Sequence, residues 1–344
     1  MEQQSAGQAA QSATSQIGSP PARRQGRAWV WILIAALSVF VAPAVGCGAF
    51  GLALVLGSRP PTSAGLGPAV GIVRVEGVIF SGRSGSSLNS AGAGSETVID
   101  LLEQANSDDS IKAIVLRIDS PGGGVAASDE IHHAILQVDK PVVVSMGSLA
   151  ASGGYYIAAP ADYIFATPHT LTGSIGVISQ FITGEELLDE VGIEVIVVTA
   201  GEVKDFGGFH RDVTEEEIAY WQEVINEAYE GFLQVVADGR DMDIETVREL
   251  ATGQVYTGHQ ALELGLIDEV GYFDDAVAKA AEIGGISGEP RVVELQPEPG
   301  LFDLLYGIQT TRQDQASLTT ALEVLRLIAA PTLEFRYIGP NSER

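Results

Sequence analysis

The chain has 344 residues, which is enough for one large domain or two small ones with a sizeable core. Its 45 acidic and 19 basic residues give a formal net charge of −26, so nucleic acid and anionic lipid surfaces would repel it. The single cysteine, Cys47, cannot form an internal disulfide, and no CxxC or HExxH pattern is present. The sequence therefore predicts a protein that binds no nucleic acid, no metal and no cofactor.

The N-terminal residues divide into a polar tail and an uncharged apolar stretch. Residues 1–27 are rich in Gln, Ser, Ala, Gly and Pro, a composition that predicts a disordered tail. Residues 28–57 contain no charge and are long enough to cross a bilayer as one transmembrane helix. Because Arg23, Arg24 and Arg27 precede this stretch, the positive-inside rule places the tail in the cytoplasm. The sequence thus predicts a single-pass protein of the cell membrane, with everything after the span outside the cytoplasm.

Other interpretations of the apolar stretch are open. The sequence "AVGC" (44–47) is lipobox-like and would make Cys47 a lipidated first residue, but the apolar run continues for ten residues beyond it. A cleaved secretory signal is also possible, although the 27-residue lead is long for one. "GCGAFG" (46–51) matches the dinucleotide-binding G-x-G-x-x-G pattern, but no strand precedes it. We expect these glycines to be helix-packing positions within an uncleaved span.

A Pro/Gly-rich linker, residues 58–68, leads into a region where strand and helix patterns alternate. The expected strands cover 69–80 (with a bend at Gly77), 111–119, 141–147 and 193–201, and the expected helices cover 95–108, 127–138, 214–240 and 274–285. This alternation predicts an α/β domain over residues 69–290, with mostly parallel strands buried on both faces and helices flanking them.

Residues 291–344 are expected to form a C-terminal extension, because "QPEPG" breaks the pattern near residue 296. Residues 321–340 read as an amphipathic tail, which predicts a helix that packs on the same domain or on a neighbouring subunit. A regulatory or membrane-touching role is the alternative.

The first candidate for chemistry is "DSPGGGV", residues 119–125, between an expected strand and an expected helix. Consecutive glycines free backbone N–H groups to point into a cleft. A phosphate-binding P-loop is excluded because no Lys-Ser/Thr pair follows. An oxyanion hole and an ordinary turn from strand to helix both stay open.

The second candidate is "SLAASGGYY", residues 148–156, where Ser152 follows a strand and begins a helix-like segment. The helix dipole favours negative charge at that position, and the Gly153 N–H is available as an oxyanion donor. The alternative is that Ser152 is a plain N-cap.

A serine nucleophile needs a base. None of the five histidines carries a clear triad signal, and the chain lacks G-x-S-x-G. Lys204, one of four lysines, lies in the Gly-flanked "GEVKDFGG" after the expected strand 193–201. A lysine base near neutral pH needs a pKa about 2–3 below the ordinary value of about 10.4, and burial can supply that shift. The alternative is a solvated surface lysine paired with Asp205.

Four blocks in order decide between these alternatives: "LRIDSPGGGV", "VVVSMGSLAASGGYYIAAPADYIFATPHTLTGSIGVI", "GEVKDFG" and "GQVYTGHQALELGLIDEVG". Together they make residues 69 to 285, roughly two thirds of the chain, resemble the signal peptide peptidase A family, peptidase family S49. The chain has one copy of the core and so resembles the short, single-domain members. The resemblance implies a Clp protease/crotonase-like core of mostly parallel strands.

The resemblance also implies roles for particular residues. It makes Ser152 the nucleophile and Lys204 the general base, and it makes Ser174 in "TGSIGV" a hydrogen-bonding partner that positions the lysine. The oxyanion hole would come from the glycine run and the following amide. Its residues would be Gly122, Gly123 and Gly153.

The activity implied by the resemblance is that of a membrane-anchored serine endopeptidase that degrades signal peptides and other apolar peptides through an acyl-enzyme. Relatives assemble into homo-oligomeric rings, and the Ser/Lys dyad is completed across a junction. Two details depart from the family pattern: Gln254 stands where a basic residue is expected, and "FGGFHR" is looser than usual. A crotonase-like acyl-CoA enzyme and a non-catalytic membrane scaffold are the alternatives on the same fold.

Overall fold

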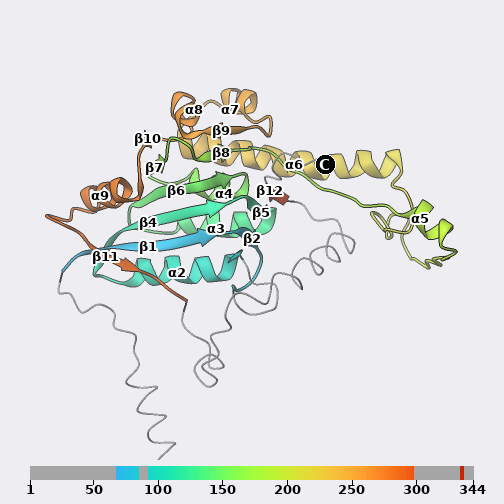
Figure 1. The fold of residues 1–344 in the computed structure, drawn as a ribbon, viewed down its shortest axis with the longest axis horizontal. Coiled ribbons are helices and arrows are strands. Elements are labelled where there is room, and N and C mark those ends of the chain that lie inside the picture. The colour runs from blue at the N-terminus through green and yellow to red at the C-terminus, as the bar shows by residue number, and fades with distance from the viewer. Residues whose placement is uncertain (1–66, 85–91, 298–333, 337–344) are drawn as a thin grey trace, which may run out of the picture. The chain divides into compact units, whose positions relative to one another are not determined.

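The computed structural model of the protein describes residues 67–84, 92–297 and 334–336 (Figure 1). The predicted tail 1–27, the predicted span 28–57 and nearly all of the linker 58–68 lie outside the described residues. Within the described ranges, no helix is long and apolar enough to cross a bilayer. The predicted domain boundaries therefore stay predictions.

The larger sheet holds eight strands in the described part of the chain. They are β1 (Ala69–Glu76), β4 (Ile111–Ser120), β6 (Val142–Ala151), β7 (Tyr163–Ala166), β8 (Leu171–Gly173), β9 (Val255–Thr257), β10 (Glu269–Val270) and β11 (Arg291–Glu294). The order is β10-β7-β6-β4-β1-β11, with every neighbouring pair parallel. Strand β8 also pairs in parallel with β6 and antiparallel with β9. The expected α/β architecture with a mostly parallel sheet is confirmed.

Helices bury this sheet on both faces, as a parallel sheet requires. Helices α2 (Ser95–Ser107) and α3 (Val125–Leu136) cover one face, and α9 (Phe273–Ile283) covers the other (Figure 1). Successive side chains of a strand point to opposite faces, so Val143 belongs to one core and Val144 to the other. The run of valines in β6 therefore fits a strand that is buried on both sides.

A smaller sheet crosses the carboxyl ends of the central strands. Its order is β12 (Glu334–Arg336), β5 (Gly122–Gly124), β2 (Val78–Phe80) and β3 (Gly92–Gly94). The bend expected at Gly77 separates β1 from β2, and Gly77 has a φ of 78°, which favours glycine. The chain therefore passes from the large sheet to the small one at this residue.

The other expected elements form with small boundary changes. The helix expected at 214–240 is α6 (Glu215–Arg240), which begins with a capping box made by Thr214 and Glu217. The strand expected at 141–147 continues to Ala151, so β6 runs up to Ser152. Shorter helices complete the fold: α4 (Gly153–Ala158), α5 (Glu185–Glu190), α7 (Ile244–Leu250) and α8 (Gly258–Glu263).

Two predictions of secondary structure are wrong. Residues 193–201 form no strand, and Ile196 and Val198 are 81% and 92% exposed. A strand needs a partner for its backbone N–H and C=O groups, and no described element pairs with this segment. The helix expected over 321–340 is contradicted at residues 334–336, which form strand β12 on β5, while its other residues lie outside the described ranges.

Candidate active site

Ser152 occupies a strained corner between β6 and α4. Its φ of 53° and ψ of −117° are rare for a residue with a side chain. The corner is held by its backbone: the Ser152 N–H donates to the Gly173 carbonyl at 2.7 Å, and its carbonyl accepts from the Tyr155 and Tyr156 amides. Ser152 is the N-cap residue of α4, as the alternative interpretation expected, but its side chain makes no capping hydrogen bond. A sharp turn from strand to helix of this kind presents a serine nucleophile in other hydrolases.

The glycines predicted for the oxyanion hole lie directly beside this corner. A Cβ on Gly122, whose φ is 91°, would lie 2.5 Å from the Gly153 nitrogen. A Cβ on Gly153 would lie 3.1 Å from the Gly123 nitrogen. The structure thus brings the amides of Gly123 and Gly153 to one small space next to Ser152. Only glycine permits this approach, because both ideal Cβ positions are sterically occupied.

The glycine run is a strand rather than a loop, and β12 pairs with it. Phe335 lies opposite Gly123 in an antiparallel register, and a Cβ on Gly122 would lie 2.0 Å from the Phe335 carbonyl oxygen. On its other edge β12 is bridged to Ile178, with mutual backbone hydrogen bonds between Ile178 and Glu334 of 3.0 and 3.1 Å. Strand β12 therefore lies between β5 and Ile178 and pairs with both.

Aromatic side chains enclose the middle residue of that strand. Phe335 is 1% exposed, and its ring stacks on Tyr156 at 4.9 Å and contacts Phe232 at 4.7 Å. Tyr156 donates from its hydroxyl to Asp129, and burial raises the pKa of this phenol. His132 packs edge-on against the same Tyr156 ring, and burial lowers its pKa. The sequence analysis missed this aromatic cluster, whose one signal is the short alternation in "LEFRY".

Ser174 lies close to Ser152 through the backbone of Gly173, which accepts the Ser152 N–H. It also has a positive φ of 50°, and its N–H donates to the Gln254 carbonyl at 2.8 Å. Its hydroxyl donates to the Gly253 carbonyl at 3.2 Å rather than to a lysine. Gln254, noted above as a departure from the family pattern, therefore supports Ser174 through its main chain.

Lys204 is not brought to these residues within the described chain. It is exposed on a turn that follows α5 in the chain, and α5 has no buried residue and stands apart from the sheet (Figure 1). Lys204 is a solvated surface lysine, as the alternative expected, but its expected pairing with Asp205 is wrong, because the Asp205 carboxylate binds Arg211 instead. Among the residues the structure describes, Lys204 forms no ion pair. The burial that a lysine base requires is therefore not supplied by this copy of the chain.

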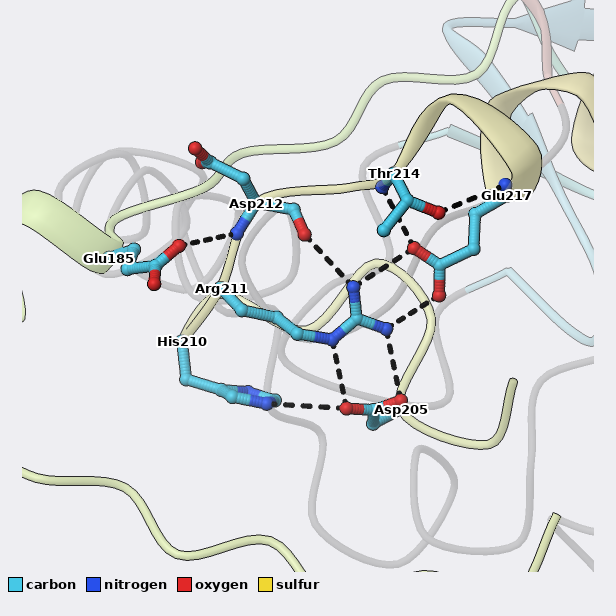
Figure 2. A network of polar contacts seen from close by, with 7 residues as sticks. All are labelled: Glu185, Asp205, His210, Arg211, Asp212, Thr214 and Glu217. Carbon is cyan, nitrogen blue, oxygen red and sulfur yellow. Dashed lines mark hydrogen bonds and ion pairs between the residues drawn. The ribbon is translucent and has the colours of Figure 1, made fainter. Parts of the chain in front are cut away.

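Arg211 is the centre of a polar network beside this turn (Figure 2). It binds Asp205 and Glu217, each through two nitrogens, at 2.6–3.0 Å. These bonds lower the pKa of both carboxyls to about 2. His210 also faces Asp205 at 3.6 Å. The sequence analysis noted "FGGFHR" only as a loose match and missed this network, although the spacing of Asp205, Arg211 and Glu217 was visible.

The described residues offer no metal site. No group of three or more His, Cys, Asp or Glu side chains that could hold an ion occurs in the ranges the structure describes. A cavity of about 680 Å³ lies between α3 and α6, lined in part by Arg240 and Asp268, but Ser152 is not in its lining.

Comparisons with known proteins show the family to which the chain belongs. The pattern of peptidase family S49 matches residues 134–287, which include Ser152, Ser174 and Lys204. The pattern of the Clp protease family matches residues 87–173, which include the glycine run. A relative in Methanocaldococcus jannaschii, named as a candidate protease, is 41% identical over 212 residues, 60% of this chain and 68% of that protein.

Two further relatives are longer than the matched region. Protease 4 of Salmonella typhi is 37% identical over 252 residues, which are 72% of this chain and 40% of that protein. A candidate signal peptide peptidase of Enterococcus faecium is 41% identical over 179 residues, 51% of this chain and 52% of that protein. The chain belongs to peptidase family S49 and is a serine peptidase. Peptide hydrolysis is thus favoured over an acyl-CoA reaction and over a non-catalytic scaffold.

Proposed function

We propose that the protein is a membrane-anchored serine endopeptidase with Ser152 as nucleophile, Lys204 as general base and Ser174 positioning the lysine. The observation that carries the proposal is the strained Ser152 corner beside the converging amides of Gly123 and Gly153. Backbone N–H groups placed where a negative oxygen develops are worth about 2.7–4 kcal/mol each in such reactions. No metal or cofactor is needed for this chemistry.

The reaction proceeds in two steps. The Ser152 Oγ attacks the scissile carbonyl carbon and its proton passes to the neutral Lys204 Nζ, while the Gly123 and Gly153 amides donate to the carbonyl oxygen. The lysine then gives that proton to the leaving amine, and the C–N bond breaks to leave a Ser152 ester. Water, deprotonated by the lysine, attacks the ester carbonyl and releases the acid product and the free serine.

Strand β12 supports a substrate that binds as an extended strand. A peptide in its place would pair antiparallel with β5 on one side and with Ile178 on the other, as in strand-addition recognition. The Phe335 carbonyl lies against Gly122 beside the Gly153 amide, where the scissile carbonyl of a substrate belongs. The aromatic cluster of Tyr156 and Phe232 then favours a bulky apolar side chain just before the cleaved bond.

A second copy of the chain is the proposed source of Lys204 at each active site. Residues 193–198 expose a run of apolar side chains to solvent. Lys204 follows this segment in the chain and is also exposed. A neighbouring copy would bury both, giving the segment a partner and the lysine the apolar surroundings that a neutral amine requires. Head-to-tail contacts of this kind close into a homo-oligomeric ring.

The proposed place of action is the outer side of the cytoplasmic membrane. Residues 28–57 carry no charge and follow three arginines, which favours an uncleaved span with a cytoplasmic N-terminus. The Enterococcus faecium relative is named as a signal peptide peptidase, and the aromatic cluster fits that substrate class. The proposed substrates are therefore signal peptides and other apolar peptides in or near the membrane.

The test uses the full chain in detergent, a serine-reactive phosphonate probe and a fluorogenic apolar peptide. Ser152→Ala is expected to lose labelling and to lower kcat by about four orders of magnitude or more. Lys204→Ala is expected to lower kcat by about 10²–10⁴. Ser148→Ala, on the exposed face of the same strand, and Lys279→Ala, a lysine paired with Glu282 on α9, are the matched controls and keep full activity. Undiminished cleavage by Lys204→Ala, or labelling that does not depend on Ser152, would overturn the assignment.

A further inference from the structure

Arg211 uses its complete set of donors. A guanidinium carries five N–H groups, and in this chain all five are bonded. Asp205 accepts two at 2.9 and 3.0 Å, Glu217 accepts two at 2.6 and 2.9 Å, and the Asp212 carbonyl accepts the fifth at 2.9 Å. Figure 2 shows the guanidinium held between the two carboxylates. Such a fully bonded, two-sided clamp fixes the geometry of both partners more firmly than a single surface ion pair.

The two carboxylates belong to different parts of the chain. Asp205 directly follows Lys204 on the exposed turn. Glu217 lies in the first turn of α6, is 7% exposed and closes the capping box with Thr214. The far end of α6 is anchored in the core by Phe232 and Val236. A continuous chain of contacts therefore runs from the core, along α6, through Arg211 to the residue beside Lys204.

The clamp also decides which cation Asp205 binds. A carboxylate adjacent to an ammonium group stabilises its protonated form, and a protonated lysine cannot accept a proton from serine. Asp205 faces Arg211 and His210, while Glu202 is the other carboxylate of the turn and is exposed. Both Asp205 oxygens accept from Arg211, and within the described residues Asp205 forms no ion pair with its sequence neighbour Lys204.

We propose that Arg211 is a positioning residue that acts through Asp205, fixing the turn that carries Lys204 and keeping this carboxylate from pairing with the lysine. The inference rests on the proposed function, in which Lys204 is the general base. It assigns two separable effects to one side chain: the placement of the amine, and the ease with which the amine loses its proton. Arg211 does not touch the substrate.

The experiment measures kcat and KM of the full chain against pH with the apolar peptide. Arg211→Gln is expected to lower kcat by about 10–100-fold with little change in KM, because a misplaced base slows the chemical step. The acidic limb of its pH profile is expected to move up by about one pH unit, because Asp205 becomes free to pair with Lys204. The double variant Arg211→Gln/Asp205→Asn is expected to return the limb to its wild-type position while kcat stays low.

Further variants separate this role from a merely structural one. Arg248→Gln is the matched control, because Arg248 also binds a carboxylate of α6, Glu230, through two nitrogens, but lies away from the turn. It is expected to leave the profile unchanged. Arg211→Lys keeps the positive charge but lacks the five-donor guanidinium. Its pH profile is expected to keep the acidic limb at the wild-type position, while its kcat lies between those of Arg211→Gln and the wild type. If Arg211→Gln does not fold, Asp205→Asn alone takes its place, because this variant keeps the Arg211–Glu217 pair. Its kcat is expected to fall, and the acidic limb of its pH profile is expected not to move up.

Several results would overturn the inference. A wild-type profile and kcat in Arg211→Gln would show that the clamp does not act on catalysis. A limb that stays shifted in the double variant would show that Asp205 is not the cause. If Lys204→Ala keeps full activity, the proposed function fails first. If Lys204→Ala is inactive and Arg211→Gln behaves like Arg248→Gln, this inference alone fails.

Discussion

Phe335 lies opposite Gly123 in the antiparallel pair of β12 and β5, with its carbonyl oxygen against Gly122 and its ring on Tyr156. The protein's own C-terminal segment thus occupies the place that a substrate strand would take under the proposed function. Burial of a phenylalanine side chain contributes about 1.5–3 kcal/mol, so this strand is a real competitor for that place.

Removing the strand should therefore open that place to substrate. A chain that ends at Ala330 lacks β12, and we expect its KM for an added apolar peptide to fall by about tenfold, with kcat little changed. A chain that ends at Pro340 keeps β12 and is the matched control. Steady-state kinetics on both chains check the prediction, and an unchanged KM in the shorter chain would contradict it.

The glycine run offers a closely matched pair of substitutions. A Cβ on Gly123 would lie 1.9 Å from the Ile79 carbonyl oxygen, whereas one on Gly124 meets nothing closer than 3.8 Å. We expect Gly123→Ala to lower the free energy of unfolding by more than about 3 kcal/mol and to abolish cleavage, because β5 and its amide must move. Gly124→Ala is expected to cost at most about 1 kcal/mol as an N-cap change and to keep activity. Equal effects in a denaturant titration would argue against the close approach of β2 and β5.

The origin of Lys204 is testable by mixing two inactive variants. If Ser152 and Lys204 come from different copies in a head-to-tail ring, co-assembled Ser152→Ala and Lys204→Ala chains regenerate about a quarter of the wild-type sites. Peptide cleavage by the co-expressed, co-purified mixture is the measurement. Each variant alone is the control, and a mixture that stays inactive although both chains are present in one assembly would place the lysine in its own chain.

His132 makes stability depend on pH in a defined direction. Burial lowers its pKa in the folded state below the ordinary value of about 6.5, so the unfolded chain binds more protons between the two values. The resulting stability is present above about pH 6.5 and is lost as the pH falls through the lowered pKa. We expect His132→Gln to flatten this dependence in denaturant titrations. His133→Gln, on the exposed face of α3, is expected to change it less, because the charge of His133 is a smaller cause of the His132 shift than burial.

The Arg211 clamp should release at acid pH only. The pKa of both Asp205 and Glu217 is lowered to about 2, so the pairing energy is complete above their ordinary values near 4 and is lost as the pH falls toward 2. Trp221 in α6 packs on Phe206 and Phe181, so its fluorescence reports on whether the segment that carries Asp205 stays packed against α6. In the full chain with Trp29→Phe and Trp31→Phe, Trp221 fluorescence is expected to be constant from pH 8 to 5 and to change between about 4 and 2. With Arg211→Gln added, the Trp221 fluorescence at pH 7 should already equal the value that the chain with Arg211 shows at about pH 2.

Much of the fold could be predicted from local patterns. The β-branched runs of β4 and β6, the glycine bend at Gly77 and the Thr214–Glu217 capping box depend on residues close together in the chain. Such elements form because their own neighbours satisfy the backbone and because both faces of the strands are apolar. The apolar segment 193–201 has the same local pattern and forms no strand, because a strand also needs a second chain segment to pair with.

The site divides in the same way. Residue types and order in the sequence marked Ser152, Lys204, Ser174 and the glycine run as a set, and they also predicted the α/β class and the peptidase family. Only the tertiary structure decided the strained backbone of Ser152, the convergence of the Gly123 and Gly153 amides, and the seating of Phe335 beside them. It also decided that Asp205 binds Arg211 rather than Lys204. The features at Ser152 join backbones far apart in the chain, and their distances depend on how the two sheets pack, which no local pattern encodes. Asp205 and Arg211 lie close together in the sequence, but which cation the carboxylate binds depends on how their turn folds against α6.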